Sequence, residues 1–113
     1  FSDIFRRNLL LGKDVYLDMC TSCHLTDGKG VKGIYPPLAN SDFLLNKPTA
    51  SIQAIKFGMS GEILVNGIKY NTEMQPLGLE DDEVADVMNY ISNSWGNKSK
   101  ERITLEQVIK IKI

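Results

Sequence analysis

The stretch that most constrains this chain is Cys20-Thr21-Ser22-Cys23-His24, a C-x-x-C-H motif. Two thiols three positions apart on one helical turn can each form a thioether with one of the two vinyl groups of a haem. The histidine that follows then lies under the iron, where an imidazole nitrogen can bind it. The chain has no other cysteine and no other histidine. The motif therefore predicts one covalent haem c held by Cys20 and Cys23, with His24 as an axial ligand.

Three other uses of a C-x-x-C pair fit the sequence less well. A thioredoxin-like redox pair would lie in a βαβ pattern, and no such pattern surrounds this motif. A zinc site would need a well-placed fourth ligand beside the two thiolates and the imidazole. A structural disulfide would leave His24 unexplained.

Chain length and charge set the next limits. With 113 residues the chain is expected to form one domain with a modest core, to which a haem would add a large apolar surface. The formal net charge of −1 offers no concentrated basic surface for nucleic acid. The sequence has no apolar run of membrane-span length, and residues 1–7 lack the apolar core of a signal peptide. Because haem attachment of this type generally occurs outside the cytoplasmic membrane, we expect a mature or trimmed chain, or a domain cut from a longer one.

Apolar residues at helical spacing predict a first helix over about 8–20, with Asn8 as a plausible N-cap. Gly12 in its interior suggests close approach of another backbone, although a glycine there can also be merely tolerated. A short helix is expected over 47–57, ended by Gly58.

A β-hairpin is expected over 62–70, because β-rich flanks surround the dipeptide Asn66-Gly67. The last long helix is predicted over about 80–95, with an acidic first turn and Gly96 just after its end. The stretch 104–107 resembles a capping box.

Met74 is the expected second ligand of the iron. It lies in a loop between the hairpin and the last helix, where a thioether can reach the opposite face of a haem, and methionine ligation raises the reduction potential. Most methionines are core residues, and Met19 and Met88 fit that role by their helical spacing. Met59, just after a helix-ending glycine, is the rival ligand; the proline that follows Met74 favours Met74.

The segment after the motif is a glycine-rich polar loop that leads to Pro36-Pro37. Two prolines remove two N–H donors and leave carbonyl groups free to accept hydrogen bonds. One of these carbonyls could hold the second ring nitrogen of His24, as partners of metal-bound imidazoles do. A simple rigid turn explains the prolines equally well.

The chain resembles the class I (mitochondrial-type) c-type cytochromes over essentially its whole length after about Asn8. Besides the haem motif, Gly12 and Tyr16 are similar to that family's glycine and aromatic residue on the N-terminal helix, and Tyr90 to the aromatic residue on the C-terminal helix that packs across them. Pro36 is similar to the proline whose carbonyl accepts a hydrogen bond from the ligating histidine. The resemblance implies an all-α cytochrome c fold in which the N- and C-terminal helices cross.

Three stretches, 33–42, 65–74 and 94–97, are most similar to the cytochrome domains or subunits of bacterial periplasmic oxidoreductases, such as haem-containing copper nitrite reductases and quinoprotein alcohol dehydrogenases. In such domains the methionine after Tyr-Asn is the distal ligand, which implies Met74, with Tyr70 among the residues at the haem. Here Gln75 separates that methionine from Pro76, and Glu80 replaces the usual serine cap of the last helix.

The expected whole is one cytochrome c domain over 1–113, with a core at about 8–97 and a C-terminal extension at 98–113. Its expected role is one-electron transfer with redox-protein partners, as a periplasmic carrier or as the relay of a larger oxidoreductase, and not catalysis. Attachment to a membrane through a removed segment stays open. The alternative is an open or labile sixth coordination site that binds a small molecule, for which the sequence offers no distal histidine and only Glu73 as a nearby carboxylate.

Overall fold

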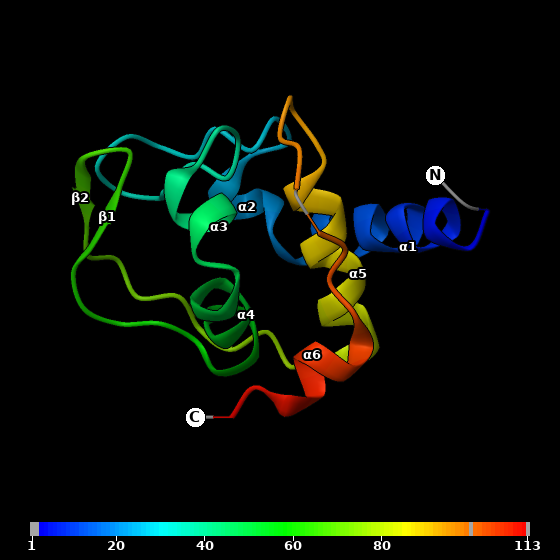
Figure 1. Ribbon diagram of the computed structural model, residues 1–113. Coiled ribbons are helices and arrows are strands. Elements are labelled where there is room, and N and C mark those ends of the chain that lie inside the picture. Colours follow the sequence, from blue (N-terminus) through cyan, green and yellow to red (C-terminus); the bar gives the residue numbers. More distant parts are fainter. Residues whose placement is uncertain (1–2, 100, 113) are drawn as a thin grey trace.

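Residues 3–99 and 101–112 are described by a computed structural model of the chain, shown in Figure 1. Within these residues, six helices accompany one two-stranded hairpin, which confirms the predicted all-α class with a short hairpin. The elements in chain order are α1 (Asp3–Met19), α2 (Thr21–His24), α3 (Asp42–Asn46), α4 (Pro48–Phe57), β1 (Ile63–Val65), β2 (Ile68–Tyr70), α5 (Asp81–Ser92) and α6 (Leu105–Lys110). None of the helices in this part of the chain combines the length and the apolar character needed to cross a bilayer.

Helices α1 and α5 cross and pack against each other, and the crossing point is Gly12 (Figure 1). A Cβ atom at this position would overlap the backbone carbonyl of Asp86 and lie 2.9 Å from the Cβ of Tyr90. Glycine is therefore required here because the two backbones touch, which explains its place inside a helix. One turn further along, the rings of Tyr16 and Tyr90 pack with their centroids 5.7 Å apart.

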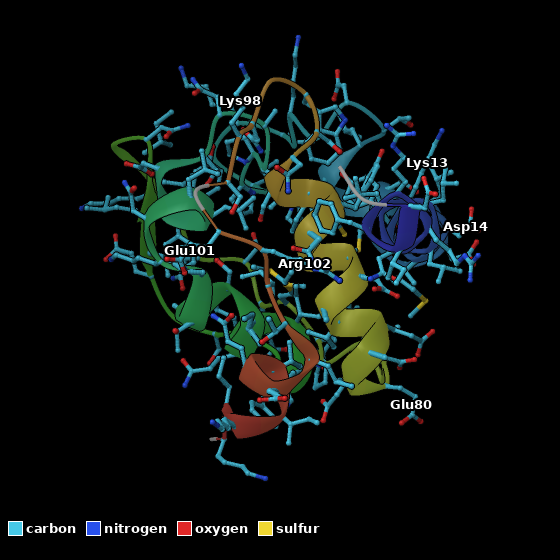
Figure 2. All side chains as sticks on the ribbon, turned by 45° about the vertical axis from the view of Figure 1, so that its right-hand side comes forward. Lys13, Asp14, Glu80, Lys98, Glu101 and Arg102 are labelled. Atoms are coloured by element: carbon cyan, nitrogen blue, oxygen red, sulfur yellow. The ribbon has the colours of Figure 1, made fainter. Side chains whose placement is uncertain are left out.

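The start of α1 differs from the prediction, because the helix begins at Asp3 and Asn8 lies inside it. The earlier turn is stabilised by tertiary contacts that no local capping pattern encodes. Phe5 is buried, and the guanidinium of Arg102 lies 4.9 Å from the centre of its ring. Figure 2 shows Arg102 on the segment that follows α5 and lies across that helix.

Only part of the apolar surface of α1 is buried. Leu10 and Leu11 are exposed, because consecutive leucines point in directions about 100° apart and α5 covers only one of these directions. Met19, expected in the core, is 40% exposed, so that expectation was wrong. Met88 on α5 is fully buried, as expected.

Helix α5 begins close to the expected position but ends at Ser92 rather than at Trp95. The chain leaves the helix at Asn93, and Trp95 then adopts a left-handed conformation, with φ of 54°. Its indole then packs against Tyr16, with 5.1 Å between ring centroids, and its Nε1–H donates to the carbonyl of Thr26. At the helix start, the Glu83 carboxylate accepts from the Glu80 N–H at 2.9 Å, which offsets the loss of the serine cap.

The hairpin and α4 agree with the prediction. Strands β1 and β2 pair around Asn66-Gly67 with Val65 opposite Ile68, and α4 ends before Gly58. The short helix α3 was not predicted. It forms because the Ser41 hydroxyl accepts from the N–H of Leu44 and satisfies a donor of the first turn.

The segment after α5 returns along that helix to α6, as Figures 1 and 2 show. The buried side chain of Asn89 fixes it, because its Nδ2 donates to the carbonyl of Ile103 and its Oδ1 accepts from the N–H of the same residue. Helix α6 begins as the capping pattern predicted, with the Thr104 hydroxyl accepting from the N–H of Gln107. At its end, Lys56 from α4 donates to the carbonyls of Val108 and Ile111.

Candidate functional site

His24 ends the short helix α2, and its ring is fixed by a single backbone carbonyl. The Nδ1 atom lies 2.8 Å from the carbonyl oxygen of Pro36. Since a carbonyl can only accept, Nδ1 must carry the hydrogen, and the lone pair of the neutral ring is then on Nε2. The sequence left two roles open for the prolines, a carbonyl partner for His24 and a simple rigid turn. In the structure, Pro36 provides the carbonyl partner.

The surroundings of His24 favour its neutral form. The residue is buried, and burial lowers the pKa of the imidazole, while the hydrogen bond to Pro36 acts in the opposite direction. A neutral imidazole with one free nitrogen is the form that binds a metal. The ring is thus held in the tautomer that offers Nε2 to an iron.

Cys20 and Cys23 lie one helical turn apart, next to His24. The N–H groups of Cys23 and His24 both donate to the carbonyl of Cys20, at 3.3 and 3.0 Å. The two thiols are not joined in a disulfide, and no group of three metal-ligating side chains is found within residues 3–99 and 101–112. Burial, and to a lesser extent Cys23, raises the pKa of the Cys20 thiol to about 11, unlike a redox-active thiolate.

An aromatic cluster of Tyr16, Tyr90 and Trp95 holds the chain just after His24. The Tyr16 hydroxyl donates to the carbonyl of Leu25 at 2.6 Å, and Trp95 holds the carbonyl of Thr26. Burial is the main cause that raises the pKa of Tyr16, so its hydroxyl stays a donor. The crossing of α1 and α5 therefore positions the haem motif directly.

An apolar cavity opens in front of His24. Its volume is about 620 Å³, including the part open to solvent. Cys20 and His24 line one side of it, and Met59 and Met74 also face it. The rest of its wall is almost entirely apolar and comes from the proline loop, α3, α4, β1 and α5: Pro36, Pro37, Leu38, Phe43, Leu44, Ala54, Ile55, Ile63, Val65, Val87 and Ile91, with the hydroxyl residues Ser41 and Ser51.

Met59 and Met74 are directly paired by their backbones. Each N–H donates to the carbonyl of the other at 2.8 Å, which forms an isolated antiparallel bridge. Met74 packs against the hydrophobic core, together with Leu77 and Leu79. Gly58 permits this pairing, because a Cβ atom there would lie 2.7 Å from the Met74 carbonyl oxygen.

Not all sequence-predicted site residues meet at the cavity. Tyr70 is buried in β2 but does not line the cavity, and Cys23 lies on the same turn as Cys20 without lining it. Sequence reasoning missed the role of Asn97, whose buried side chain holds the backbone of Leu38 and Asn40 in the loop after the prolines. An asparagine just after a helix-ending glycine gives only a turn signal.

The described residues fit a haem. The thiol of Cys20, an imidazole nitrogen fixed in the ligating tautomer, and the thioethers of Met59 and Met74 line one apolar cavity, and the thiol of Cys23 lies one helical turn from that of Cys20. Within the part of the chain that the structure describes, every fully buried side-chain nitrogen and oxygen atom has a hydrogen-bond partner.

Comparisons with known proteins agree with this donor set. The family model described as cytochrome c matches residues 9–95. Cytochrome c-552 of Thermus thermophilus is 34% identical over 110 residues, which span 89% of this chain and 83% of that protein. The cytochrome c subunit of a quinone alcohol dehydrogenase from Gluconobacter oxydans is 31% identical over 111 residues, which span 89% of this chain but 22% of that subunit. The gluconate 2-dehydrogenase cytochrome c subunit of Pantoea cypripedii is 33% identical over 105 residues, again 89% of this chain and 24% of that subunit.

Proposed function

Since the chain belongs to the cytochrome c family and is an electron-transfer component with one covalent haem c, we propose that it carries single electrons with His24 and Met74 as the axial ligands of the iron. The observation that carries this proposal is the arrangement of the cavity. His24 offers Nε2 because Nδ1 is committed to Pro36, and a thioether faces the same apolar space. Methionine and histidine together favour the moderate to high potential of an electron carrier.

When bound, the haem supplies the one-electron chemistry. The chain supplies the ligands, a pocket that excludes water, and a backbone that holds the ligands in place. Cys20 and Cys23 tether it covalently next to His24. The apolar wall excludes water and thereby favours the less charged oxidation state of the site. The backbone pairing of Met59 with Met74 limits movement of the thioether, so little reorganisation accompanies the gain or loss of an electron.

The partners follow from the same role. The relatives named above include a cytochrome c-552, of which this chain spans 83%, and cytochrome subunits of dehydrogenases. We propose that this chain likewise passes electrons to or from a larger oxidoreductase, as a separate carrier or as one of its domains, and that it works outside the cytoplasmic membrane, where haem c is attached.

A small-molecule-binding haem with an open sixth position is less well supported. Catalysis on a bound molecule would use a group near the distal face that donates or accepts protons. His24 is the only histidine and is engaged with Pro36. Glu73 beside Met74 is exposed and accepts a hydrogen bond from Gln75, so it belongs to the surface rather than to the cavity.

The first prediction tests the distal ligand in the oxidised holoprotein. Wild type and Met59→Ala should both show a low-spin spectrum with a weak far-red sulfur-to-iron charge-transfer band. Met74→Ala should lose this band, and its reduction potential should fall, because the thioether that favours the reduced iron is gone. Absorption spectra and redox titrations of the three proteins make the comparison.

Loss of the band in Met59→Ala alone would transfer the ligand role to Met59. Survival of the band in both single variants, with loss in the double variant, would show that either thioether can bind, contrary to the proposal. A wild-type spectrum that is high-spin and lacks the band would mean an open iron and would favour small-molecule binding.

A further inference from the structure

We propose that Asn97 is a positioning residue for the proximal ligand: it holds the loop whose Pro36 carbonyl orients His24, and thereby tunes the iron. This inference rests on the proposed function, because it assigns a role to a residue that acts through His24. Asn97 lies outside the haem motif and does not line the cavity.

The side chain of Asn97 is buried, with 4% of its surface exposed, and all its hydrogen-bonding capacity points at backbone groups. Its Oδ1 accepts from the N–H of Asn40 at 2.7 Å. Its Nδ2 donates to the carbonyls of Leu38 and Ile91, both at 2.9 Å. Because both partners of Nδ2 are acceptors and the partner of Oδ1 is a donor, only one orientation of the amide satisfies the site.

These contacts join two parts of the molecule. Ile91 belongs to α5, whereas Leu38 and Asn40 belong to the loop that begins with Pro36. One amide group therefore ties the proline loop to the helix that crosses α1. The loop is irregular here and turns at residues 39–40, where Asn40 has a φ of 53°, so it lacks the backbone ladder that would hold a strand.

The loop has few other attachments. The N–H groups of Leu38 and Ala39 both donate to the carbonyl of Gly28, at 2.6 and 2.9 Å. On its far side, the Asn66 amide of the hairpin turn donates to the carbonyl of Asn40 at 3.0 Å. Removal of the Asn97 amide would leave the N–H of Asn40 and the carbonyl of Leu38 without these partners, within four residues of Pro36.

The chemical consequence runs through His24. A hydrogen bond from Nδ1–H to a carbonyl makes the imidazole a more basic ligand, which stabilises the oxidised iron. When the loop is released, the Pro36 carbonyl is held less firmly at the 2.8 Å contact, and this bond weakens on average. Loss of Asn97 should therefore raise the reduction potential and speed the exchange of the His24 Nδ1–H with solvent.

The chain contains a matched control for this effect. Asn89 is also buried, with 2% of its surface exposed, and its amide likewise makes hydrogen bonds to backbone on both its oxygen and its nitrogen. Its partner is Ile103, in the segment that leads to α6, and it does not line the cavity. Loss of Asn89 should cost stability by the same mechanism without any contact to the proline loop.

The experiment uses the reduced holoprotein labelled with ¹⁵N-histidine. His24 is the only histidine, so the Nδ1–H gives one resonance without assignment. In Asn97→Ala, we expect this resonance to shift and its exchange with solvent to accelerate by about fivefold, the factor that corresponds to one hydrogen bond of about 1 kcal/mol. The reduction potential should rise. In Asn89→Ala, the midpoint of chemical denaturation should fall, with the resonance and the potential unchanged.

A second variant covers the case in which Asn97→Ala does not fold. Asn97→Ser is neutral and replaces the amide by a short hydroxyl, so the same shift of the resonance and the same rise of the potential are expected without a charge being placed near the iron. The inference is overturned if the variants lose stability but keep the wild-type resonance and potential, or if Asn89→Ala moves them equally. Failure of the proposed function would instead be visible in the wild type, as a spectrum without His–Met ligation.

Discussion

At the scale of single residues, the two faces of the cavity depend on backbone groups held in close contact. On the proximal side the Pro36 carbonyl fixes His24, and on the distal side the Met74 carbonyl lies against Gly58. The His24 ring and the loop that carries Met74 are thus positioned by contacts with backbone groups, which move less than side chains do. Each of these contacts has little room for an added atom.

Gly58 provides the second prediction. It adopts a φ of 81°, and an added Cβ would approach the Met74 carbonyl oxygen and the Pro76 ring, whereas Gly61, with a φ of 90°, faces open space. Gly61→Ala should therefore cost roughly 1–2 kcal/mol through backbone strain alone. Gly58→Ala should cost about 1–3 kcal/mol more and should weaken the far-red band, because the clash displaces Met74.

Denaturation curves and absorption spectra of the two variants check this expectation. If Gly58→Ala and Gly61→Ala lose equal stability and both keep the band, the contact between Gly58 and the Met74 loop does not position the thioether.

Much of the site was visible in the sequence at this scale. The order of thiols, imidazole, proline and methionine is local or follows a known family pattern, and the structure brings His24, Pro36 and Met74 to one cavity. The distal assignment stays a prediction, because the backbone bridge places Met59 opposite Met74. Asn97 was not found, since its partners lie far back in the chain and only the folded loop brings them near.

At the scale of elements, Lys56 on α4 binds the end of α6, a helix that also buries Val108 in the core. Lys56 is 12% exposed, its Nζ lies 2.7 and 3.1 Å from the carbonyls of Val108 and Ile111, and it also pairs with Asp81 at 3.2 Å. A cation at the end of a helix satisfies its last carbonyls and suits the helix dipole.

The third prediction follows from this contact. Lys56→Met should cost about 1–3 kcal/mol, because the carbonyls and Asp81 lose their partner in a partly buried place. The amides of α6 should exchange with deuterium faster than in wild type, while those of α5 stay protected. Mass spectrometry of peptides from the two helices, with a denaturation curve, makes the measurement.

Lys69→Met is the matched control, since Lys69 forms a pair with Glu62 at 3.6 Å but is 76% exposed. An exposed pair of this kind contributes about 0–1 kcal/mol, so this variant should unfold close to wild type. Equal effects of the two substitutions would mean that Lys56 does not hold α6.

The elements show which signals the sequence carried. The hairpin, α4 and the α6 cap were predicted because Asn-Gly, Pro-to-Gly and Thr-x-x-Gln patterns act locally. The predicted start of α1 and the predicted end of α5 were wrong, because tertiary contacts decide them. Phe5 packs against Arg102 before the expected start of α1, and Trp95 lies outside α5, where it packs on Tyr16. The 98–113 segment remains a proposed extension of the domain.

At the scale of the whole molecule, stability responds to pH through the helix crossing. Asp86 lies on α5 next to α1, and the pKa of its carboxyl is raised above the usual 3.8. Burial is the main cause, and the neighbouring Asp82 and, more weakly, Glu83 act in the same direction, whereas Arg102 lowers this pKa. The folded protein therefore holds this proton more firmly than the unfolded chain. Ionisation of Asp86 destabilises the fold at neutral pH, and this cost disappears as the pH falls below the unfolded value.

The fourth prediction is that Asp86→Asn is more stable than wild type at pH 7, and that the difference shrinks as the pH falls toward 4. Denaturation midpoints of both proteins across this range test it. Asp14→Asn, which removes an exposed carboxylate from α1, should stay within about 0.5 kcal/mol of wild type. A difference between Asp86→Asn and wild type that grows on acidification would contradict the assigned direction.

The contact of Gly12 with Asp86 also has a topological consequence. It closes residues 12–86 into one long loop, and the closing contact is between the backbones of two helices. All the residues that line the cavity lie between Cys20 and Ile91, either in this loop or on α5, the helix that closes it. Closure of a loop of this length costs on the order of 4 kcal/mol of chain entropy. A chain cut within this loop would still have two parts that meet at Gly12 and Asp86. Two fragments divided between His24 and Met74 should therefore reassociate and rebuild the cavity, with His24 from one fragment and Met74 from the other.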